Sequence, residues 1–384
     1  MKRKVMVVTG TRSEYGLLKP VMNAISTHAD LELLVAVTGM HLLPEFGHTI
    51  DLIKTDGYPM TPPIDMYEAG EPDHSYAFGR AAQGFTIALA ENNPDIVLVL
   101  GDRLEILAAV IPAVIQGRLV AHIHGGDTSA CGMIDDSIRH AITKFAHIHF
   151  AATNESATRL RRLGEEDFRI HTVGSPAIDA VRQVELLSRT ELASQLNFHA
   201  IGNNPLIVCL FHSVAYEADR AYDQMSAVLR SIAGFMADCV VIYPNNDTGN
   251  EEVIRAINEH AQSERFHVVK NLSSREYYSL LDAASCLIGN SSSGLIETPI
   301  FGLPSLSVGS RQTGREHGNN VIFVGHDQLS VESGLRRVLY DVEFRQSCRE
   351  ARNPYGDGRA ADRISEVLAT VELTPEFLIK KLTY

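Results

Sequence analysis

Long apolar segments are absent from this sequence, which argues against a membrane-spanning helix. No run reaches the ~18 apolar residues that such a helix requires. Lys2, Arg3 and Lys4 resemble the charged start of a signal peptide, but the apolar run behind them, residues 5–8, is too short to form its core. We therefore expect residues 4–9 to form the first strand of a cytoplasmic protein that has no membrane partner.

Cysteine is sparse, and its spacing excludes two common uses. The five cysteines contain no CxxC pair and are odd in number, which argues against a disulfide framework and against a thiolate zinc site. We expect most of them to be small buried side chains. They are Cys131, Cys209, Cys239, Cys286 and Cys348.

Positive charge is in deficit, since the formal net charge is -13. Such a surface repels nucleic acid and anionic membranes in general, so we expect neither as a partner. A small anionic ligand is still allowed, because a local cluster of arginine, histidine and backbone N–H groups can override the mean field.

What the sequence contains is a repeated strand, turn and helix pattern over 384 residues, a length that favours two domains. Continuous β-branched runs that alternate with helices indicate parallel sheets covered on both faces. The predicted strands are residues 4–9, 31–38, 96–100, 119–124, 148–152 and 170–173 in the first half, and 206–211, 240–243, 267–269, 286–288 and 305–308 in the second.

The predicted fold is α/β, with two Rossmann-like, doubly wound domains facing a cleft. The pattern pauses near residues 174–180, so we place the domains at residues 1–176 and 177–364, with the helical end 365–384 packing back on the first. Ligands of open parallel sheets bind outside the carboxyl ends of the strands. Polar residues that directly follow strands are therefore the first candidates for a site.

The turn after the first strand has glycines but lacks the GxGxxG dinucleotide fingerprint, and we expect no cofactor. Arg12 adds a forked positive charge where a helix N-terminus favours an anion such as a diphosphate. An ordinary strand-to-helix turn explains the same residues.

Acidic residues cluster after the next strands. Asp102 can act as a base, bind sugar hydroxyls or cap the following helix, and Arg103 stands beside it. Asp135 and Asp136 open a helix, where one acid suits the helix dipole, and Arg139 can hold one carboxylate by a forked ion pair. The residues alone leave these alternatives open.

His122 and His124 share one face of a strand, and Asp127 follows them. The H-x-H spacing suggests metal, but flexible glycines separate the carboxylate from the histidines. We therefore favour catalytic or structural roles and expect no metal.

In the second half, three strands end in polar residues. His212 and Asn245 follow two of them, and a Ser-rich turn at 289–294 follows the third. Small hydroxyl residues between glycines at a helix start present donors to a phosphate. Glu297, inside that helix, can accept from ribose hydroxyls or simply suit the helix dipole.

Several segments, in the same order, resemble the UDP-N-acetylglucosamine 2-epimerase family. They are residues 10–16, 101–103, 134–140, 243–245, 289–297 and 311–316. The Gly101-Asp102-Arg103 segment resembles the hydrolysing branch, of the sialic acid and legionaminic acid biosynthesis type.

The resemblance implies a GT-B-like fold, a homodimer or homotetramer, and the reaction of UDP-GlcNAc with water to give N-acetylmannosamine and UDP through a 2-acetamidoglucal. The catalytic residues that it implies are Asp102, His124, Asp127, Asp135 and His212. The implied binding residues are Arg12, Asn245, Ser291, Ser292 and Glu297 at the nucleotide, His41 at the sugar, and Arg103 and Arg311 in the positive lining.

One position departs from the family pattern. Many relatives carry a glutamate with a proton-transfer role where this chain has His124. Either His124 or Asp127 takes that role here, since both residue types can transfer protons.

Four other functions fit the same residues. The chemistry can act on a UDP-linked 2,4-diacetamido-trideoxy sugar or on a GDP-sugar, and the same cleft can serve a GT-B glycosyltransferase. A nucleotide-sugar sensor and a metallohydrolase complete the alternatives.

Overall fold

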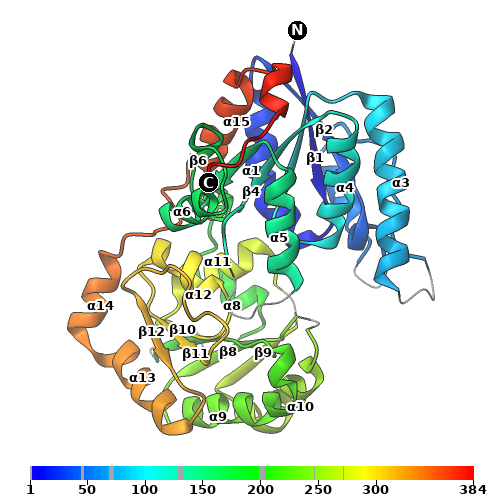
Figure 1. Ribbon diagram of the computed structural model, residues 1–384. Coiled ribbons are helices and arrows are strands. Elements are labelled where there is room, and N and C mark those ends of the chain that lie inside the picture. Colours follow the sequence, from blue (N-terminus) through cyan, green and yellow to red (C-terminus); the bar gives the residue numbers. More distant parts are fainter. Residues whose placement is uncertain are drawn as a thin grey trace. The chain divides into compact units, whose positions relative to one another are not determined.

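The computed structural model describes residues 2–44, 47–68, 73–128, 134–198, 204–245, 247–270 and 272–384. The described residues form two compact units, shown in Figure 1. The first unit contains residues 2–128, 134–183 and 355–384, and the second contains residues 184–354. Cys131 lies outside the described residues, and the other four cysteines are buried thiols, as expected.

The first unit is built on a six-stranded parallel sheet with the order β2-β1-β3-β4-β5-β6. Its strands are β1 (Arg3–Thr9), β2 (Leu31–Val37), β3 (Ile96–Leu100), β4 (Leu119–Ile123), β5 (Ile148–Ala151) and β6 (Ile170–Thr172). Its helices are α1 (Arg12–Thr27), α2 (Ile50–Thr55), α3 (His74–Asn92), α4 (Leu104–Ile115), α5 (Ile134–Phe145), α6 (Asn154–Arg162), α7 (Pro176–Gln183) and α15 (Ala360–Thr370), with the 3-10 turns η1 (Gly39–Leu42), η3 (Asp167–Arg169) and η6 (Pro375–Leu378).

Both faces of this sheet are apolar, because neighbouring side chains of each strand point to opposite faces. Val5 and Val7 of β1 pack in a core that also contains residues of α1 and α15. Met6 and Val8 pack on the other face with residues of α3, α4 and α5. The helices thus cover both faces of the sheet, as continuous apolar strands predict.

The second unit has a six-stranded parallel sheet with the order β12-β11-β10-β7-β8-β9. Its strands are β7 (Leu206–Leu210), β8 (Asp238–Ile242), β9 (Phe266–Val269), β10 (Cys286–Gly289), β11 (Ser305–Val308) and β12 (Val321–Val324). Its helices are α8 (Arg189–Gln195), α9 (Ala221–Ala233), α10 (Asn250–His260), α11 (Ser274–Ala283), α12 (Ser293–Ile296), α13 (Gln328–Tyr340) and α14 (Val342–Arg349), with η4 (Ala215–Arg220) and η5 (Thr298–Phe301). The predicted α/β class with two parallel-sheet domains is confirmed.

The strand order of each sheet reverses at one point. In the first unit this point lies between the neighbouring strands β1 and β3. The chain runs from β1 outward to β2 on one side, and from β3 outward to β4, β5 and β6 on the other. In the second unit the corresponding neighbours are β7 and β10. Loops that leave the carboxyl ends of strands at such a switch point diverge, and ligands of doubly wound sheets bind there.

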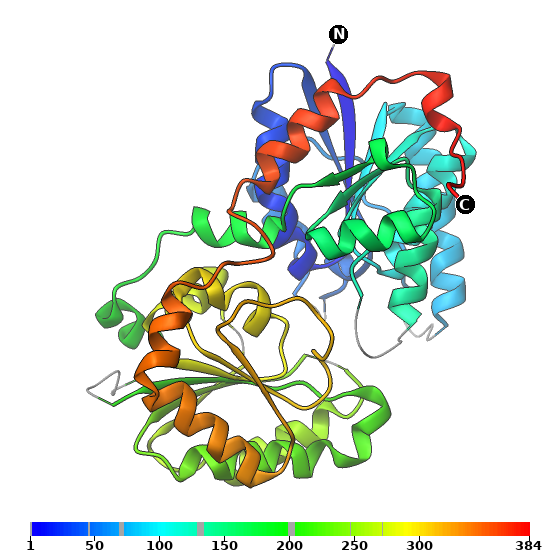
Figure 2. The ribbon, with the colours of Figure 1, turned by 60° about the vertical axis from the view of Figure 1, so that its left-hand side comes forward.

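The end of the chain returns to the first unit, where α15 packs on α1 and α7 (Figure 2). The return begins at Tyr355, earlier than the predicted residue 365, and α7 belongs to the first unit although the predicted boundary lies at residue 176. A long-range cap explains the difference, because the buried carboxylate of Asp179 in α7 accepts from the backbone N–H groups of Ala360 (3.1 Å) and Ala361 (2.9 Å).

None of the helices in the described part of the chain has both the length and the apolar composition that crossing a membrane requires.

Candidate functional site

Asp102 lies just after β3 at the switch point of the first sheet, and its carboxylate has a specific partner. Helix α4 has Arg103 at its N-cap position. The Asp102 carboxylate accepts a hydrogen bond from the guanidinium of Arg139 in α5. The side chain therefore faces α5 rather than the backbone of α4, which removes the capping alternative.

Arg139 connects three parts of this region. Besides Asp102, its guanidinium donates to the backbone oxygen of His124 at 3.3 Å, and its Nε lies 3.7 Å from Oδ1 of Asp136. The fork of a guanidinium suits such simultaneous contacts. Arg139 thereby fixes the end of β3, the end of β4 and the first turn of α5 relative to one another.

Asp135 occupies the first turn of α5 and is half-buried. Burial, together with the negative charge of Asp102, raises the pKa of the Asp135 carboxyl above its ordinary value. Asp135 therefore retains its proton to a higher pH than an exposed aspartate does.

His124 follows β4 in a left-handed backbone conformation, with φ at +65°. Such strain in a non-glycine residue is uncommon and is concentrated at functional sites. The ring is bracketed, because Nε2 lies 3.1 Å from Oγ of Ser175 and Nδ1 lies 3.8 Å from Oδ2 of Asp127. The other oxygen of Asp127 accepts from Oγ of Ser156 at 2.6 Å. Asp127 is thus placed to orient the His124 ring.

Glycine is required beside this pair. Gly126 has φ at +78°, and a Cβ at this position would lie 2.3 Å from the backbone oxygen of Ser156. The close approach brings Ser156 within reach of Asp127. Ser156 and Ser175 were not predicted as site residues, although Ser175 stands in the Gly-Ser-Pro pause of the sequence.

His122 has a structural role in the first unit. Its ring is fully buried, and burial lowers its pKa to about 3, so the imidazole is neutral. Nε2 bonds the backbone oxygen of Gly101 at 2.7 Å. His122 therefore supports the backbone that leads into Asp102. Within the described ranges, no three His, Cys, Asp or Glu side chains are grouped as metal ligands.

Two other predicted residues of the first unit have different surroundings from those expected. Arg103 donates twice to the buried carboxylate of Glu105, at 2.8 and 3.2 Å. His41 is fully buried, with Nε2 3.0 Å from Oγ1 of Thr9 and Nδ1 2.7 Å from Oγ1 of Thr49. Because both ring nitrogens of His41 are occupied, we leave it out of the proposed site. Arg12 is exposed at the first residue of α1.

Glu14 is a buried carboxyl beside the first turn. One oxygen accepts from the Gly10 N–H at 2.8 Å, whereas the other lacks a hydrogen-bond partner among the described residues. Burial, reinforced by Glu105, raises the pKa of Glu14 to about 8. Because the ordinary value is 4.5, the native state binds this proton more tightly than the unfolded chain. The stability that this proton contributes is present below pH 4.5 and is lost as the pH rises through about 8.

Replacing Glu14 by glutamine, which keeps an acceptor for Gly10 without the charge, should therefore remove this pH dependence. We expect Glu14→Gln to unfold at a higher temperature than the wild type at pH 9, with a much smaller advantage at pH 5. Thermal unfolding followed by circular dichroism across this range measures it, with Glu91→Gln, an exposed residue of α3, as the control. Parallel curves for the wild type and Glu14→Gln would contradict the assignment.

In the second unit, the switch point is closed by a reciprocal pair of hydrogen bonds. The His212 N–H after β7 donates to Oδ1 of Asn290 after β10 at 2.7 Å, and Nδ2 of Asn290 donates to the His212 carbonyl oxygen at 2.8 Å. Gly289 allows this approach, because a Cβ there would lie 1.9 Å from the Leu210 oxygen. Asn290 is thus an organising residue that was not predicted individually.

His212 is held as a neutral donor. Its Nδ1 accepts from the Asn245 N–H at 3.2 Å. Burial, with the nearby charge of Arg311, lowers the pKa of His212 to about 3. The neutral ring therefore carries its proton on Nε2, which can donate a hydrogen bond but cannot act as an imidazolium near neutral pH.

The loop at residues 311–312 is anchored on the same asparagine. Arg311 NH1 and Gln312 Nε2 donate to the Asn290 backbone oxygen at 3.2 and 2.9 Å. Arg311 also lies 3.5 Å from a carboxylate oxygen of Asp247. A positive side chain is thereby fixed beside His212 and the serine turn.

The serine turn begins α12, which is a single turn of four residues. Ser291 Oγ accepts from the Ser293 N–H at 3.3 Å, and Ser292 occupies the N-cap position. Burial raises the pKa of Glu297, and its Oε2 has no hydrogen-bond partner in the described part of the chain. Glu297 is the C-cap of α12, and the chain continues as the 3-10 turn η5, which has Pro299 in its first turn and ends at Gly302.

Comparison with known sequences matches this chain to a family. The profile described as UDP-N-acetylglucosamine 2-epimerase matches residues 23–369. A UDP-N,N'-diacetylbacillosamine 2-epimerase (hydrolyzing) of Legionella pneumophila is 35% identical over 386 residues, and the alignment covers 100% of both chains. A UDP-N-acetylglucosamine 2-epimerase of Neisseria meningitidis is 32% identical over 96% of both chains.

Solved structures show the same fold. The UDP-GlcNAc 2-epimerase from Neisseria meningitidis bound to UDP-GlcNAc superposes with a TM-score of 0.82 at 19% identity, covering 95% of this chain and 99% of that one. The Methanocaldococcus jannaschii UDP-GlcNAc 2-epimerase in complex with UDP-GlcNAc and UDP gives a TM-score of 0.77 at 19% identity, with the same coverage. The fold is therefore GT-B-like, and the profile and sequence matches together establish that this chain belongs to the UDP-N-acetylglucosamine 2-epimerase family.

Proposed function

We propose that the protein is a hydrolysing UDP-sugar 2-epimerase that converts UDP-GlcNAc and water into N-acetylmannosamine and UDP. One observation carries the proposal. In a member of this family, Arg139 ties the Asp102 carboxylate to the end of β4 and to the acidic first turn of α5. Several acid and base groups then surround one region, as inversion at a sugar carbon requires.

The second unit supplies the nucleotide contacts in this proposal. Backbone N–H and hydroxyl groups of Ser291 and Ser292 bind the diphosphate, Arg311 adds positive charge, and Nε2 of His212 donates a neutral hydrogen bond. Glu297 accepts from the ribose hydroxyls. Arg12, exposed at the start of α1, adds charge from the first unit. These groups stabilise the leaving UDP.

The reaction begins with cleavage of the C1–O bond to the diphosphate, which makes C1 electron-poor and acidifies the C2–H bond. A base removes the C2 proton, so that UDP and a 2-acetamidoglucal form. An acid then returns a proton to C2 from the opposite face, and water adds at C1 to give the free sugar. No electrons are exchanged with a cofactor at any step.

The surroundings of each group favour particular roles. Asp102, paired with Arg139, acts as the base, whereas Asp135 is suited to donate because its pKa is raised. His124 takes the place of the family glutamate in proton transfer, and Asp127 orients its ring at 3.8 Å. In this proposal proton transfer is therefore assigned to His124 and not to Asp127, because the approach at 3.8 Å lets Asp127 act through the ring.

The sequence relatives favour a second candidate substrate. The Legionella relative that matches the whole chain is described as acting on UDP-N,N'-diacetylbacillosamine, and a Campylobacter jejuni relative, 31% identical, as acting on the GDP- or UDP-linked form. This sugar has the same 2-acetamido group beside C1, so the same elimination applies without a change of catalytic residues.

A single assay in deuterium oxide tests the proposal. The enzyme is incubated without any acceptor with UDP-GlcNAc, UDP-N,N'-diacetylbacillosamine and the GDP-linked analogue, and the released sugars are examined by NMR. We expect UDP and a free manno-configured sugar carrying one deuterium at C2. The nucleotide sugar that is converted at the highest rate is the substrate. Activity that requires an acceptor would indicate a glycosyltransferase. Binding of the nucleotide sugar without turnover would indicate a sensor, and loss of activity with a chelator would indicate a metallohydrolase.

A further inference from the structure

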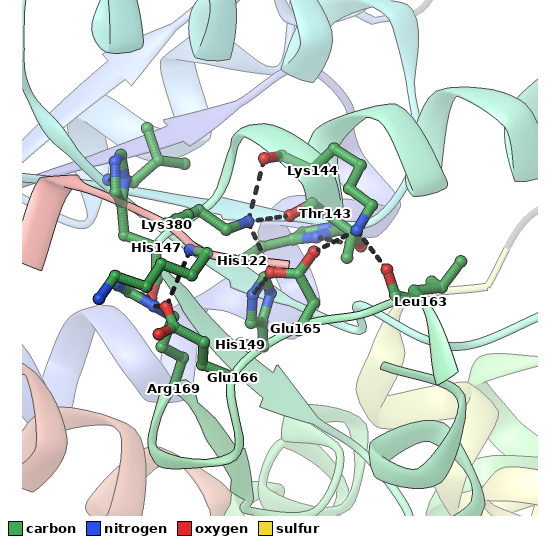
Figure 3. Close-up of polar contacts among 12 residues, drawn as sticks. His122, Thr143, Lys144, His147, His149, Leu163, Glu165, Glu166, Arg169 and Lys380 are labelled. Atoms are coloured by element: carbon green, nitrogen blue, oxygen red, sulfur yellow. Dashed lines mark hydrogen bonds and ion pairs between the residues drawn. The ribbon is translucent and has the colours of Figure 1, made fainter. Parts of the chain in front are cut away.

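The end of the chain contacts the far end of α5, the helix that begins with Asp135. Figure 3 shows Lys380 pointing at the last turn of this helix. Its Nζ donates to the carbonyl oxygens of Thr143 and Lys144, both at 3.0 Å. The last carbonyls of a helix have no partner within the helix, and a cation is favourable there. Lys380 therefore caps the C-terminus of α5.

A buried carboxylate holds the Lys380 ammonium group in place. Oε2 of Glu165 lies 2.6 Å from Nζ of Lys380 and 3.0 Å from Nε2 of His149, and Oε1 lies 2.9 Å from Nζ of Lys144. Burial alone would raise the pKa of Glu165, but the hydrogen bonds from His149, Lys380 and Lys144 outweigh it and lower the pKa to about 2. Glu165 is thus ionised near neutral pH, with the Lys380 ammonium group beside it.

The backbone on either side of Lys380 is fixed by a buried arginine. Arg169, which is 1% exposed, donates to the carbonyl oxygens of Phe377 at 2.8 Å and Ile379 at 3.1 Å. Its guanidinium carbon lies 4.7 and 4.5 Å from the ring centroids of Phe168 and Phe377. The position of Lys380 is therefore set by the body of the first unit and not by its own flexible side chain alone.

Helix α5 connects this cap to the candidate site. It contains twelve residues, with Asp135, Asp136 and Arg139 at its N-terminal half and Thr143 and Lys144 at its other end. A helix of this length moves as a rigid body, so a cap on the last carbonyls restrains a shift along its axis as well as fraying. Any such shift would move Arg139 relative to Asp102.

We propose that Lys380 is a positioning residue, which holds α5 so that Asp135 and Arg139 stand correctly against Asp102. Its effect on turnover rests on the proposed function, whereas its effect on the helix does not. Neither Lys380 nor Glu165 is expected to touch the substrate.

The test compares Lys380→Met with Lys380→Arg and with Lys381→Met, which removes the same charge from the next, exposed residue. We expect Lys380→Met to lower kcat by about tenfold to a hundredfold, since misplacement of about 1 Å costs that much. KM should stay within about twofold, because the proposed nucleotide contacts are unchanged. Lys380→Arg should recover most of kcat, and Lys381→Met should match the wild type.

Amide hydrogen exchange of residues 134–145 provides a readout that does not depend on activity. We expect faster exchange in Lys380→Met alone. If the wild type shows no epimerase turnover, the proposed function fails and this exchange decides the role of Lys380. The proposal is overturned if amide exchange in Lys380→Met equals that of the wild type. It is also overturned if Lys381→Met loses as much kcat as Lys380→Met, or if Lys380→Arg recovers no kcat. Should Lys380→Met not fold, Lys380→Gln is read in the same way.

Discussion

Asp102→Asn should lower kcat by about 10²- to 10⁴-fold, the usual contribution of a general base, while the affinity for UDP stays at the wild-type level. The amide can neither take the C2 proton nor keep the charged pair with Arg139. UDP affinity is spared because Asp102 is not one of the proposed nucleotide contacts, which are Arg12 of the first unit and residues of the second unit. Release of UDP from the nucleotide sugar gives kcat, and titration calorimetry with UDP gives the affinity.

The control for this variant is Asp167→Asn, an exposed carboxylate of the same unit. It should retain wild-type kcat, because the Asp167 carboxylate is exposed and contacts Arg161 at the surface, in the turn that precedes β6. If Asp102→Asn keeps more than a tenth of the wild-type kcat, Asp102 is not the base. If its UDP affinity also collapses, Asp102 acts in folding or binding instead.

The sheets could be predicted from the sequence because their strands are continuous apolar runs. All five residues of β3 are buried, and β1 and β4 also consist mostly of buried residues. β12 was missed because its four residues, of which only Val321 is buried, do not differ from an apolar loop by pattern alone. Which strands pair, and hence where the order reverses, follows from long-range packing that a local pattern does not contain.

Helix limits were less predictable where distant residues decide them. Helix α7 ends at Gln183, and α8 covers Arg189–Gln195. Ser188 begins α8 as its N-cap, with a capping box to Glu191, and this is a local signal that the sequence contains. The contact of Asp179 with the start of α15, by contrast, joins residues too far apart in sequence to be inferred.

In the candidate site, too, local sequence signals were predictable and long-range contacts were not. Residue types after strands predicted that Asp102, His124 and Asp135 lie where ligands of such sheets bind. Their partners could not be read from the sequence, because Ser175 and Ser156 reach the His124–Asp127 pair from other elements. The two threonines that surround the buried His41 ring could likewise not be inferred from the sequence, because Thr9 and Thr49 belong to different elements.

His124→Gln should lower kcat by about 10²- to 10⁴-fold, because glutamine keeps hydrogen bonds but cannot transfer a proton. Asp127→Asn should cost less, about tenfold to a hundredfold, since Asp127 acts through the orientation of the His124 ring. His124→Glu restores the residue that many relatives carry and should retain more activity than His124→Gln. Steady-state release of UDP measures all three.

The variant His48→Gln, at an exposed histidine of the same unit, controls for loss of an imidazole as such and should leave kcat unchanged. The decisive comparison is between His124 and Asp127. A larger loss in Asp127→Asn than in His124→Gln would assign proton transfer to Asp127, with His124 as its support. Equal activity of His124→Gln and His124→Glu would mean that the side chain at this position transfers no proton. The left-handed turn after β4 would then serve only to place Arg139, whose guanidinium donates to the backbone oxygen of residue 124.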